Sequence, residues 1–405
     1  MRDPSRVLFV TRYYWPELIG SAPFSTDIAE WLAAHGRRTT VVSGLPHYPG
    51  TTVFPAYLHG RRCETVCGVE LERLECGPPR SPSTLSRILN EAEFLMRGLG
   101  ALATGRLRRH EVVLALCPSI LCVALAVAAR RRRGVCIAIV HDIQSGLAEK
   151  LGMVAGGRLS AVMRFCERLV LNRTDLVVVL SAEMKHQLRR IGVTTSIEIV
   201  PLWVDTEHLQ PAPAVDGPPI RVLYSGNLGR KQGLEQVIEL ARELATRRSD
   251  IEVVVRGNGS RAAELSAEIA RLGLTNIRMV DLQPSEALGT ALAAGDIHLV
   301  PQRPDAADFA VPSKVFNIMA VGRPFVTTAL PDSVLWRLQR QSGAFLCVPP
   351  DDPPTFAEAV IKLADDSRLR HELGRRGREF VELHYAKPLI LGHLMSRLDA
   401  FALAA

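Results

Sequence analysis

Two short segments in the second half of the chain combine glycine, serine and basic residues in an arrangement that suits an anion. Residues 225–233 read Ser-Gly-Asn-Leu-Gly-Arg-Lys-Gln-Gly, between a predicted strand and a predicted helix. Glycines let backbone N–H groups approach an anion closely, and a helix N-terminus adds positive potential. The spacing matches neither a Walker loop nor a dinucleotide fingerprint. A phosphate-binding loop and a tight structural turn therefore both stay open.

The second segment places Ser313 and Lys314 in the first turn of a predicted helix. A lysine there opposes the helix dipole. That cost is offset if the lysine and the free N–H groups share a phosphate, although a solvated lysine is the alternative.

Polar residues also follow predicted strands in the first half. Gly20 and Ser21 lie in the loop after the first strand, which either approaches a phosphate or simply connects two elements. His141 and Asp142 come directly after a strand that ends at Val140. A histidine there could donate to a sugar hydroxyl or act as an acid or base, whereas a lone histidine is often structural.

No metal site is expected. Asp351 and Asp352 lie among prolines and are interpreted as an exposed turn. The 8 cysteines form no Cys-x-x-Cys pair and lack histidine partners at zinc spacing. Such free cysteines are typical of a reducing compartment, so the protein is expected to be cytoplasmic.

These residues need a scaffold in which strand ends converge, and the pattern of elements predicts one. Strands alternate with helical patterns, and the pattern restarts after Pro201 and a proline-rich linker at 209–219. The predicted fold class is α/β, with two Rossmann-like doubly wound parallel-sheet domains facing a central cleft. The predicted domains are residues 1–205, residues 206–387, and a C-terminal helix at 388–405 that returns to the first domain. The strands are expected at Val7–Thr11, Thr39–Ser43, Val112–Leu116, Val135–Val140, Leu176–Leu180, Ile220–Ser225, Ile251–Val255, Ile277–Val280, Ile297–Val300 and Pro324–Thr328.

Charge and hydropathy indicate a partner for the first half. The 405 residues are 47% apolar and 22% charged, which excludes wholesale disorder and fibrous classes. The net charge of +7 arises entirely within residues 1–200. Residues 84–109 mix large apolar side chains with a basic end, and four arginines follow at 130–133. The segment 84–109 and the arginines at 130–133 both suit binding to an anionic membrane surface. The alternative for 84–109 is a helix that packs in the core and has a solvated charged end.

Two other partners are less well supported. Nucleic acid is not expected, because aromatic residues are only 5% and none interleaves with the arginines. The apolar run at 112–129 could be mistaken for a membrane span, but Cys117-Pro118-Ser119 divides it into a strand and a helix that continues into the arginines.

With these residues in view, the chain resembles the GT-B fold glycosyltransferases of family 4. It is most similar to bacterial exopolysaccharide and O-antigen enzymes of the fucosyl- or fucosamine-transferase type. The likeness covers nearly the whole chain. Its motifs are the Pro-Glu-containing loop after the first strand, SGLPHYPG at 43–50, HDIQSGLAEKLG from His141, PLWVD at 201–205, SGNLGRKQGLE from Ser225 and VPSKVFNIMAVGRP from Val311.

The resemblance implies roles for individual residues. His141, Lys314 and Arg230 would be catalytic, with His141 on the donor sugar. On the acceptor side it implies His47 and Asp142. The donor-binding residues would be Gly20, Gly226, Asn227, Lys231, Gln232, Leu282, Ser313 and Asn317.

The sequence departs from the family pattern at several positions. Phe309 and Asn317 stand where many members carry a Glu-x7-Glu element. Asn227 and Gln232 replace the usual arginine and lysine of the glycine loop, and Gln144-Ser145 replaces a tryptophan–proline pair.

The resemblance implies a retaining hexosyltransferase that needs no cofactor or metal. It would move a sugar from a nucleotide-diphosphate sugar, with UDP favoured, to a lipid-linked or other glycan acceptor. The expected location is cytoplasmic and peripheral, on the inner face of the plasma membrane. Three alternatives stay open: transfer to a soluble natural product, a sugar-nucleotide epimerase of the same fold, and a non-catalytic scaffold.

Overall fold

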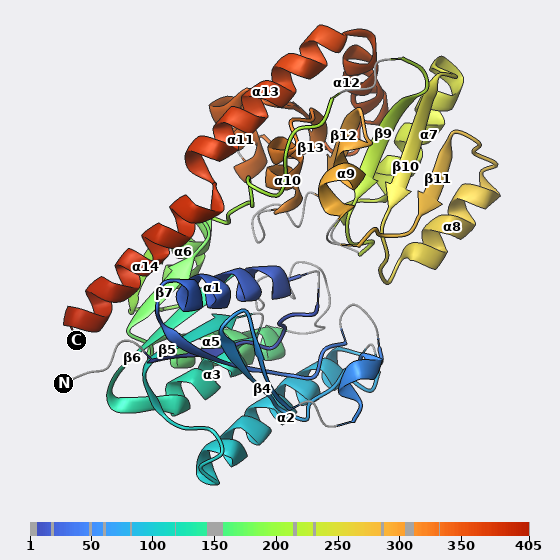
Figure 1. Ribbon diagram of the computed structural model, residues 1–405. Coiled ribbons are helices and arrows are strands. Elements are labelled where there is room, and N and C mark those ends of the chain that lie inside the picture. The colour runs from blue at the N-terminus through green and yellow to red at the C-terminus, as the bar shows by residue number, and fades with distance from the viewer. Residues whose placement is uncertain are drawn as a thin grey trace. The chain divides into compact units, whose positions relative to one another are not determined.

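The computed structural model describes residues 6–404 except 18–19, 48–50, 60–61, 82, 118, 144–156, 214–216, 230–231, 285–286, 304–311 and 332. The chain forms two compact units (Figure 1). The first unit comprises Met1–Pro201 with Leu391–Ala405, and the second comprises Leu202–Ile390.

The first unit is built on an eight-stranded sheet in the order β3-β4-β2-β1-β5-β6-β7-β8. All neighbouring strands are parallel except β3 and β4. The strand order reverses direction between β1 and β5. The strands are β1 (Arg6–Val10), β2 (Arg38–Ser43), β3 (Cys63–Val66), β4 (Val69–Arg73), β5 (His110–Cys117), β6 (Arg130–Val140), β7 (Leu176–Val179) and β8 (Ser196–Ile199).

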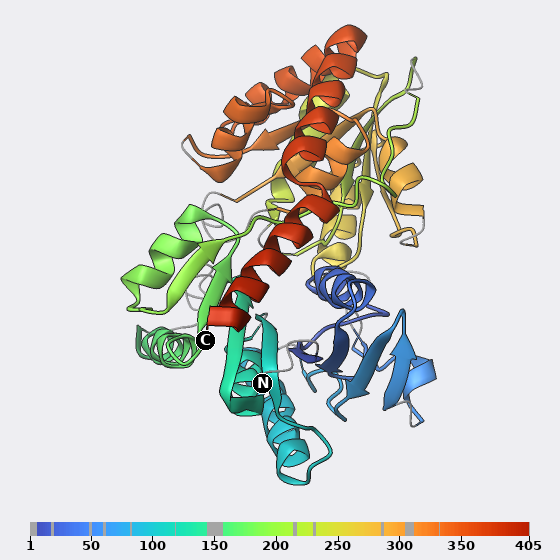
Figure 2. The same cartoon turned by 60° about the vertical axis from the view of Figure 1, so that its left-hand side comes forward.

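Helices cover both faces of this sheet. Right-handed crossovers place α2, α3, α5 and α6 on one face and α1 on the other (Figures 1 and 2). The bounds are α1 (Ala22–Ala34), the 3₁₀ turn η1 (Pro55–Tyr57), α2 (Thr84–Ala103), α3 (Ile120–Ala129), α5 (Gly157–Leu171) and α6 (Ala182–Arg190).

The apolar run at 112–129 forms most of β5 and all of α3. Among the helices described, none has the length and apolar character needed to cross a membrane. One expected boundary was wrong: α3 ends at Ala129, and the four arginines begin β6 instead of extending the helix. Arg130 pairs with His110 in the ladder, and its guanidinium donates to Asp175 at 2.6 Å, which holds it in the strand.

The second unit has a fully parallel six-stranded sheet in the order β11-β10-β9-β12-β13-β14, which reverses direction between β9 and β12. The strands are β9 (Ile220–Ser225), β10 (Ile251–Arg256), β11 (Ile277–Val280), β12 (Ile297–Pro301), β13 (Phe325–Thr328) and β14 (Leu346–Val348). The helices are α7 (Glu235–Arg247), α8 (Ala262–Arg271), α9 (Leu288–Ala293), α10 (Lys314–Ala320), α11 (Val334–Ser342), α12 (Pro353–Asp365) and α13 (Ser367–His384). Helix α14 (Lys387–Ala404) begins in this unit, and its residues from Leu391 onward belong to the first unit.

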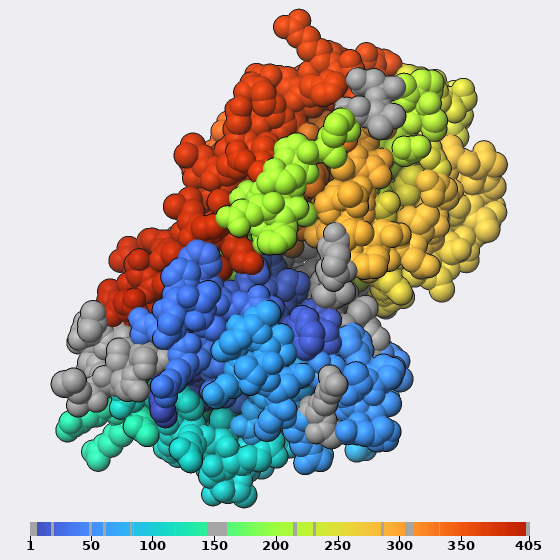
Figure 3. All heavy atoms as spheres, in the orientation of Figure 1, coloured from blue at the N-terminus to red at the C-terminus, as the bar shows by residue number. Residues whose placement is uncertain are grey.

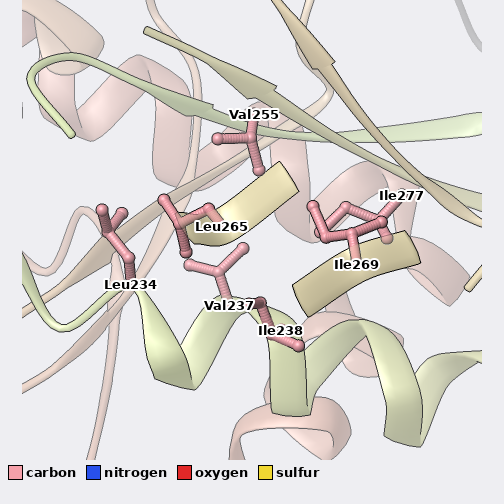
Figure 4. Close-up of a pocket in the computed structure, with 7 residues that line it drawn as sticks. All are labelled: Leu234, Val237, Ile238, Val255, Leu265, Ile269 and Ile277. Carbon is pink, nitrogen blue, oxygen red and sulfur yellow. The ribbon is translucent and has the colours of Figure 1, made fainter. Parts of the chain in front are cut away.

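The core of the second unit is apolar and closely packed. A cavity of only about 10 Å³ lies between α7, α8 and the sheet, and Figure 4 shows that aliphatic side chains alone line it. Such a space is too small and too apolar for a sugar nucleotide. The apolar core therefore holds the strands in place and does not itself bind a ligand. The polar candidate residues lie at the carboxyl ends of the strands.

The end of α14 is attached to the first unit by ion pairs. Asp399 pairs with Arg37, which follows α1, and Arg397 pairs with Glu198 on β8 at 3.2 Å. These contacts join the last helix to both α1 and the far edge of the first sheet.

Candidate active site

The second unit brings its glycine loop and its Ser-Lys segment to one point. The loop from Gly226 follows β9, and the segment that leads to α10 follows β12. Strands β9 and β12 are neighbours. From β9 the chain adds strands toward one edge of the sheet, and from β12 it adds them toward the other, so the strand order reverses between these two strands. In open α/β sheets, ligands bind outside the carboxyl ends of the strands at this reversal.

The glycine loop packs directly on the loop after β10. Gly226 has a φ of 143° and donates its N–H to Arg256 O at 3.0 Å. A Cβ on Gly257 would lie 2.1 Å from Gly226 O, so only glycine fits there. Leu228 donates its N–H to Asn258 O at 2.9 Å, and the Tyr224 hydroxyl donates to Asn227 O at 2.8 Å. These contacts fix the backbone from Gly226 to Leu228 against the loop after β10.

Lys314, the first residue of α10, points its ammonium group under this loop. Its Nζ lies 3.9 Å from the centroid of the Tyr224 ring, and a Cβ on Gly226 would come within 3.2 Å of it. The Nζ is buried and has no hydrogen-bond partner among the described residues. Burial lowers the pKa of Lys314 from 10.5 to about 7. The described residues thus present a buried amine with no hydrogen-bond partner among them, at the end of the sheet where a ligand would bind.

Other predicted donor residues surround this lysine in the same unit. The side-chain Oε1 of Gln232 is buried without a partner among the described residues. Ser313 and Asn317 are half-buried at the start of α10 and one turn further on. Leu282 is half-buried after β11. Arg230, which the resemblance implies to be catalytic, and Lys231 lie outside the described residues.

The first unit places His141 at the carboxyl end of β6. Its Nε2 is buried and has no partner in the described part of the chain, and its ring meets Phe24 edge-on at 5.3 Å. Burial lowers the pKa of His141 to about 4, so the imidazole is neutral at physiological pH. A neutral ring can donate or accept a hydrogen bond but carries no charge of its own.

Gly20 and Asp142 flank this region. Gly20 has a φ of 72° and lies just before α1, so it adopts a backbone conformation that other residues avoid. Ser21, which follows it, has a buried Oγ with no partner among the described residues. Asp142 is half-buried directly after His141.

His47 lies after β2 and is almost fully buried. Its Nδ1 is 2.9 Å from Leu45 O, so Nδ1 carries the proton and Nε2 holds the lone pair. Burial lowers the pKa of His47 and keeps the ring neutral. Its backbone N–H donates to the buried carboxylate of Glu17 at 2.9 Å. Glu17 is a residue that the sequence analysis missed, although it stands in the Pro-Glu pair of the first loop.

Two other features of the described residues do not suit a metal ion or a diphosphate. Within the described residues, no three His, Cys, Asp or Glu side chains gather as a set of metal ligands. A pocket of about 220 Å³ is lined by four carboxylates, those of Glu235, Glu239, Asp351 and Asp352. Such a lining repels a diphosphate, and Asp352 already caps α12 by accepting from Thr355 N.

The comparisons with known proteins cover both units. Residues 20–203 match the family described as glycosyl transferase 4-like domain, and residues 205–380 match glycosyl transferases group 1. A glycosyl transferase of Escherichia coli (strain K12) named for colanic acid biosynthesis, WcaI, is 29% identical over 395 residues, which span 93% of this chain and 96% of the relative.

Solved structures show the same architecture. Sucrose-phosphate synthase from Thermosynechococcus elongatus superposes with a TM-score of 0.78 at 17% identity, covering 99% of each chain. HepE of Anabaena, solved in complex with UDP-glucose, superposes with a TM-score of 0.70 at 14% identity, covering 98% of this chain and 99% of its own. The fold is therefore GT-B. Taken with the two matched domains, this shows that the chain belongs to the family-4-like glycosyltransferases of the GT-B fold.

Proposed function

We propose that this glycosyltransferase retains anomeric configuration, requires no metal, and transfers a sugar from a nucleotide-diphosphate sugar to a lipid-linked acceptor in cell-surface polysaccharide synthesis. The observation that carries the donor side is Lys314. A buried ammonium group that has no hydrogen-bond partner among the described residues, beside the backbone at Gly226, suits the diphosphate of a donor.

The proposed chemistry follows from the charge that develops on the leaving group. When the glycosidic bond to the nucleotide breaks, the diphosphate gains negative charge. A preorganised cation and backbone N–H groups stabilise that charge without reorganising. Lys314 would supply the cation, with Arg230 and Lys231 added from the loop. The described residues offer no clear carboxylate nucleophile, so we propose displacement on the front face of the sugar.

We propose UDP as the nucleotide and fucose- or fucosamine-type sugars as candidates for the transferred group. HepE binds UDP-glucose, which favours a uridine nucleotide only by analogy of fold. Leu282 would lie near the base, and His141 would bond a hydroxyl of the donor sugar. Asp142 and His47 would lie on the acceptor side.

The acceptor and the location are proposed from WcaI and from charge. WcaI is named for colanic acid biosynthesis, a polysaccharide. The basic excess of residues 1–200 favours an acceptor held at an anionic membrane. We therefore propose a peripheral protein on the cytoplasmic face of the plasma membrane.

A thermal-shift screen against UDP-, GDP- and dTDP-sugars tests the donor. A ligand at free concentration c that binds only the folded state stabilises it by RT ln(1 + c/Kd), so the unfolding midpoint rises with the logarithm of ligand concentration once this exceeds Kd. We expect UDP-sugars to raise the midpoint of the wild type and to lose that effect in Lys314→Met. A shift that is the same in both proteins would contradict the phosphate role.

A further inference from the structure

Large apolar side chains gather on the outer surface of the first unit. Among the described residues, most of the large apolar side chains that are exposed belong to only two helices, α2 and α5. They are Leu85, Ile88, Leu89 and Met96 on α2, and Val162, Phe165 and Leu169 on α5. Single exposed leucines occur on most protein surfaces. A group of exposed apolar side chains on two helices of one face indicates a surface that binds another molecule.

The exposed residues of α2 lie opposite its buried face. Asn90 and Phe94 point into the core, while Leu85, Leu89 and Met96 project outward at helical spacing and are 66%, 60% and 65% exposed. Two charged residues of this helix, Glu93 and Arg97, pair with each other at 2.7 Å, and Glu91 pairs with the buried Arg12 at 3.8 Å. The outward stripe itself is apolar.

Helix α5 repeats this arrangement. Glu167 and Leu171 are buried, and Val162, Phe165 and Leu169 project from the opposite side, with Phe165 51% exposed. Arg168 lies over the Phe165 ring at 5.3 Å from its centroid. A second apolar stripe with a basic neighbour therefore faces outward.

Helix α3 lies between these two helices and completes the surface. It packs against α2 and against α5, and all three cover the same face of the sheet (Figure 1). The half-buried residues of α3 are all apolar: Ile120, Leu121, Ala124, Val127 and Ala128. The outer surface of α2, α3 and α5, here named the three-helix face, thus carries apolar side chains from all three helices, while α2 and α5 also expose Arg87 and Arg168.

Arginines border one edge of the three-helix face. Helices α2, α3 and α5 are followed in the chain by β5, β6 and β7, which are parallel neighbours. The C-termini of the three helices therefore lie at the same end of the sheet, where these strands begin. Figure 3 shows the cyan turn after α2 on the surface at the bottom of the view. The exposed arginines at this edge are Arg106, Arg108 and Arg109 after α2, Arg131, Arg132 and Arg133 after α3, and Arg173 after α5.

We propose that the three-helix face lies on an anionic lipid leaflet, with its apolar stripes among the upper acyl chains and its arginine edge on the phosphate groups. This inference rests on the proposed lipid-linked acceptor and names the surface that would hold the enzyme there. An apolar protein surface with a cationic border is complementary to an anionic leaflet, whose acyl chains are apolar and whose headgroup layer carries negative charge. Helix α5 adds the exposed Val162, Phe165 and Leu169 to the apolar contact that α2 alone would make.

Co-sedimentation of the full chain with phosphatidylcholine vesicles, with and without phosphatidylglycerol, tests the proposal. We expect binding only to vesicles with phosphatidylglycerol, and about fivefold or greater weakening in Leu89→Ser/Phe165→Ser and in Arg132→Glu/Arg133→Glu. The matched controls are Leu330→Ser/Leu383→Ser and Arg247→Glu/Arg368→Glu, which change exposed residues of the second unit. They should bind as the wild type does. Thermal unfolding checks that every variant is folded.

The outcomes separate this inference from the proposed function. Vesicle binding that is unchanged in both face variants overturns it, whatever the acceptor is. So does a wild type that forms a dimer through this face and ignores vesicles. Binding that depends on the three-helix face supports it even if transfer to a lipid-linked acceptor fails, and that failure would count against the proposed acceptor alone.

Discussion

The carboxylate of Glu17 connects two loops of the first unit by accepting hydrogen bonds from the backbone N–H groups of His47, at 2.9 Å, and Tyr14, at 3.2 Å. Glu17 is only 4% exposed. Because α1 and β2 separate these loops in the sequence, the carboxylate sets the position of His47 relative to the end of β1. Glu17 is therefore a positioning residue.

Replacing Glu17 should act on the acceptor side and leave the donor side intact. Glu17→Ala leaves two buried N–H groups without partners, each costing about 1–3 kcal/mol. We expect a lower unfolding midpoint and a raised KM for the acceptor, with KM for the donor unchanged. Glu17→Gln, which retains one acceptor oxygen, should recover part of both losses. Steady-state kinetics with each substrate varied in turn measure this, and a rise in donor KM alone would count against it.

Removing the buried ammonium group should cost turnover. Lys314→Met keeps the apolar stem against Tyr224 but deletes the charge. We expect a fall in kcat of about 10²-fold or more, the scale of losing one preorganised electrostatic contact. Lys362→Met, which alters an exposed lysine on α12, is the matched control and should be active. Equal kinetics for the wild type and Lys314→Met would disprove the phosphate contact.

Donor binding should take up a proton. In the free protein the pKa of Lys314 is lowered to about 7, so near pH 8 its amine is mostly neutral. A bound diphosphate favours the charged form and raises that pKa. Calorimetry at pH 8 in two buffers with different ionisation enthalpies should give different apparent heats. The difference should vanish in Lys314→Met, and identical heats in the wild type would contradict the prediction.

The same lysine should affect stability in a defined pH range. The unfolded chain binds the proton up to about pH 10.5, whereas the folded protein releases it at about pH 7. Between these values the unfolded state holds more protons, so the free energy of unfolding should rise with pH. Denaturant titrations at several pH values should show this rise in the wild type and a flatter profile in Lys314→Met. A flat wild-type profile would contradict the assignment.

A side chain at Gly226 should damage the donor site. Gly226→Ala must adopt a φ of 143° and would place its Cβ 3.2 Å from Lys314 Nζ. Gly217→Ala is the matched control, because Gly217 has a φ of 125° but open space around it. Both variants should lose some stability, whereas only Gly226→Ala should also lose the midpoint shift given by UDP-sugars. An undiminished shift in Gly226→Ala would show that the loop does not approach the donor.

Much of the fold could be predicted because the strands are apolar and short. Ile220–Ser225 and Ile277–Val280 coincide with β9 and β11. The continuous apolar run Leu176–Val179 forms β7, all of whose residues are buried, as expected for a strand covered on both faces. The end of α3 could not be predicted, because the arginines continue a helical pattern locally. Their place in β6 depends on Asp175, which is distant in the sequence.

The sequence pointed to individual candidate residues but not to their contacts. A lysine in the first turn of a helix pointed to Lys314, yet nothing in the sequence places Tyr224 beneath its ammonium group. Glu17 was missed because a carboxylate that bonds only to backbone leaves no spacing pattern. Helix α5 was missed as an exposed apolar surface, since Val162, Phe165 and Leu169 read equally well as a core stripe until burial is known.

The contact between Gly257 and Gly226 O has a consequence for redesign of this enzyme. No side chain can be introduced at Gly257, where a Cβ would lie 2.1 Å from that oxygen, and Gly259 is similarly crowded, at 2.5 Å from Leu228 O. A library that varies these loops would consist mostly of misfolded proteins. Attempts to change the nucleotide should instead vary the segment after β11, where Leu282 is half-buried and, on the proposed function, would lie near the base.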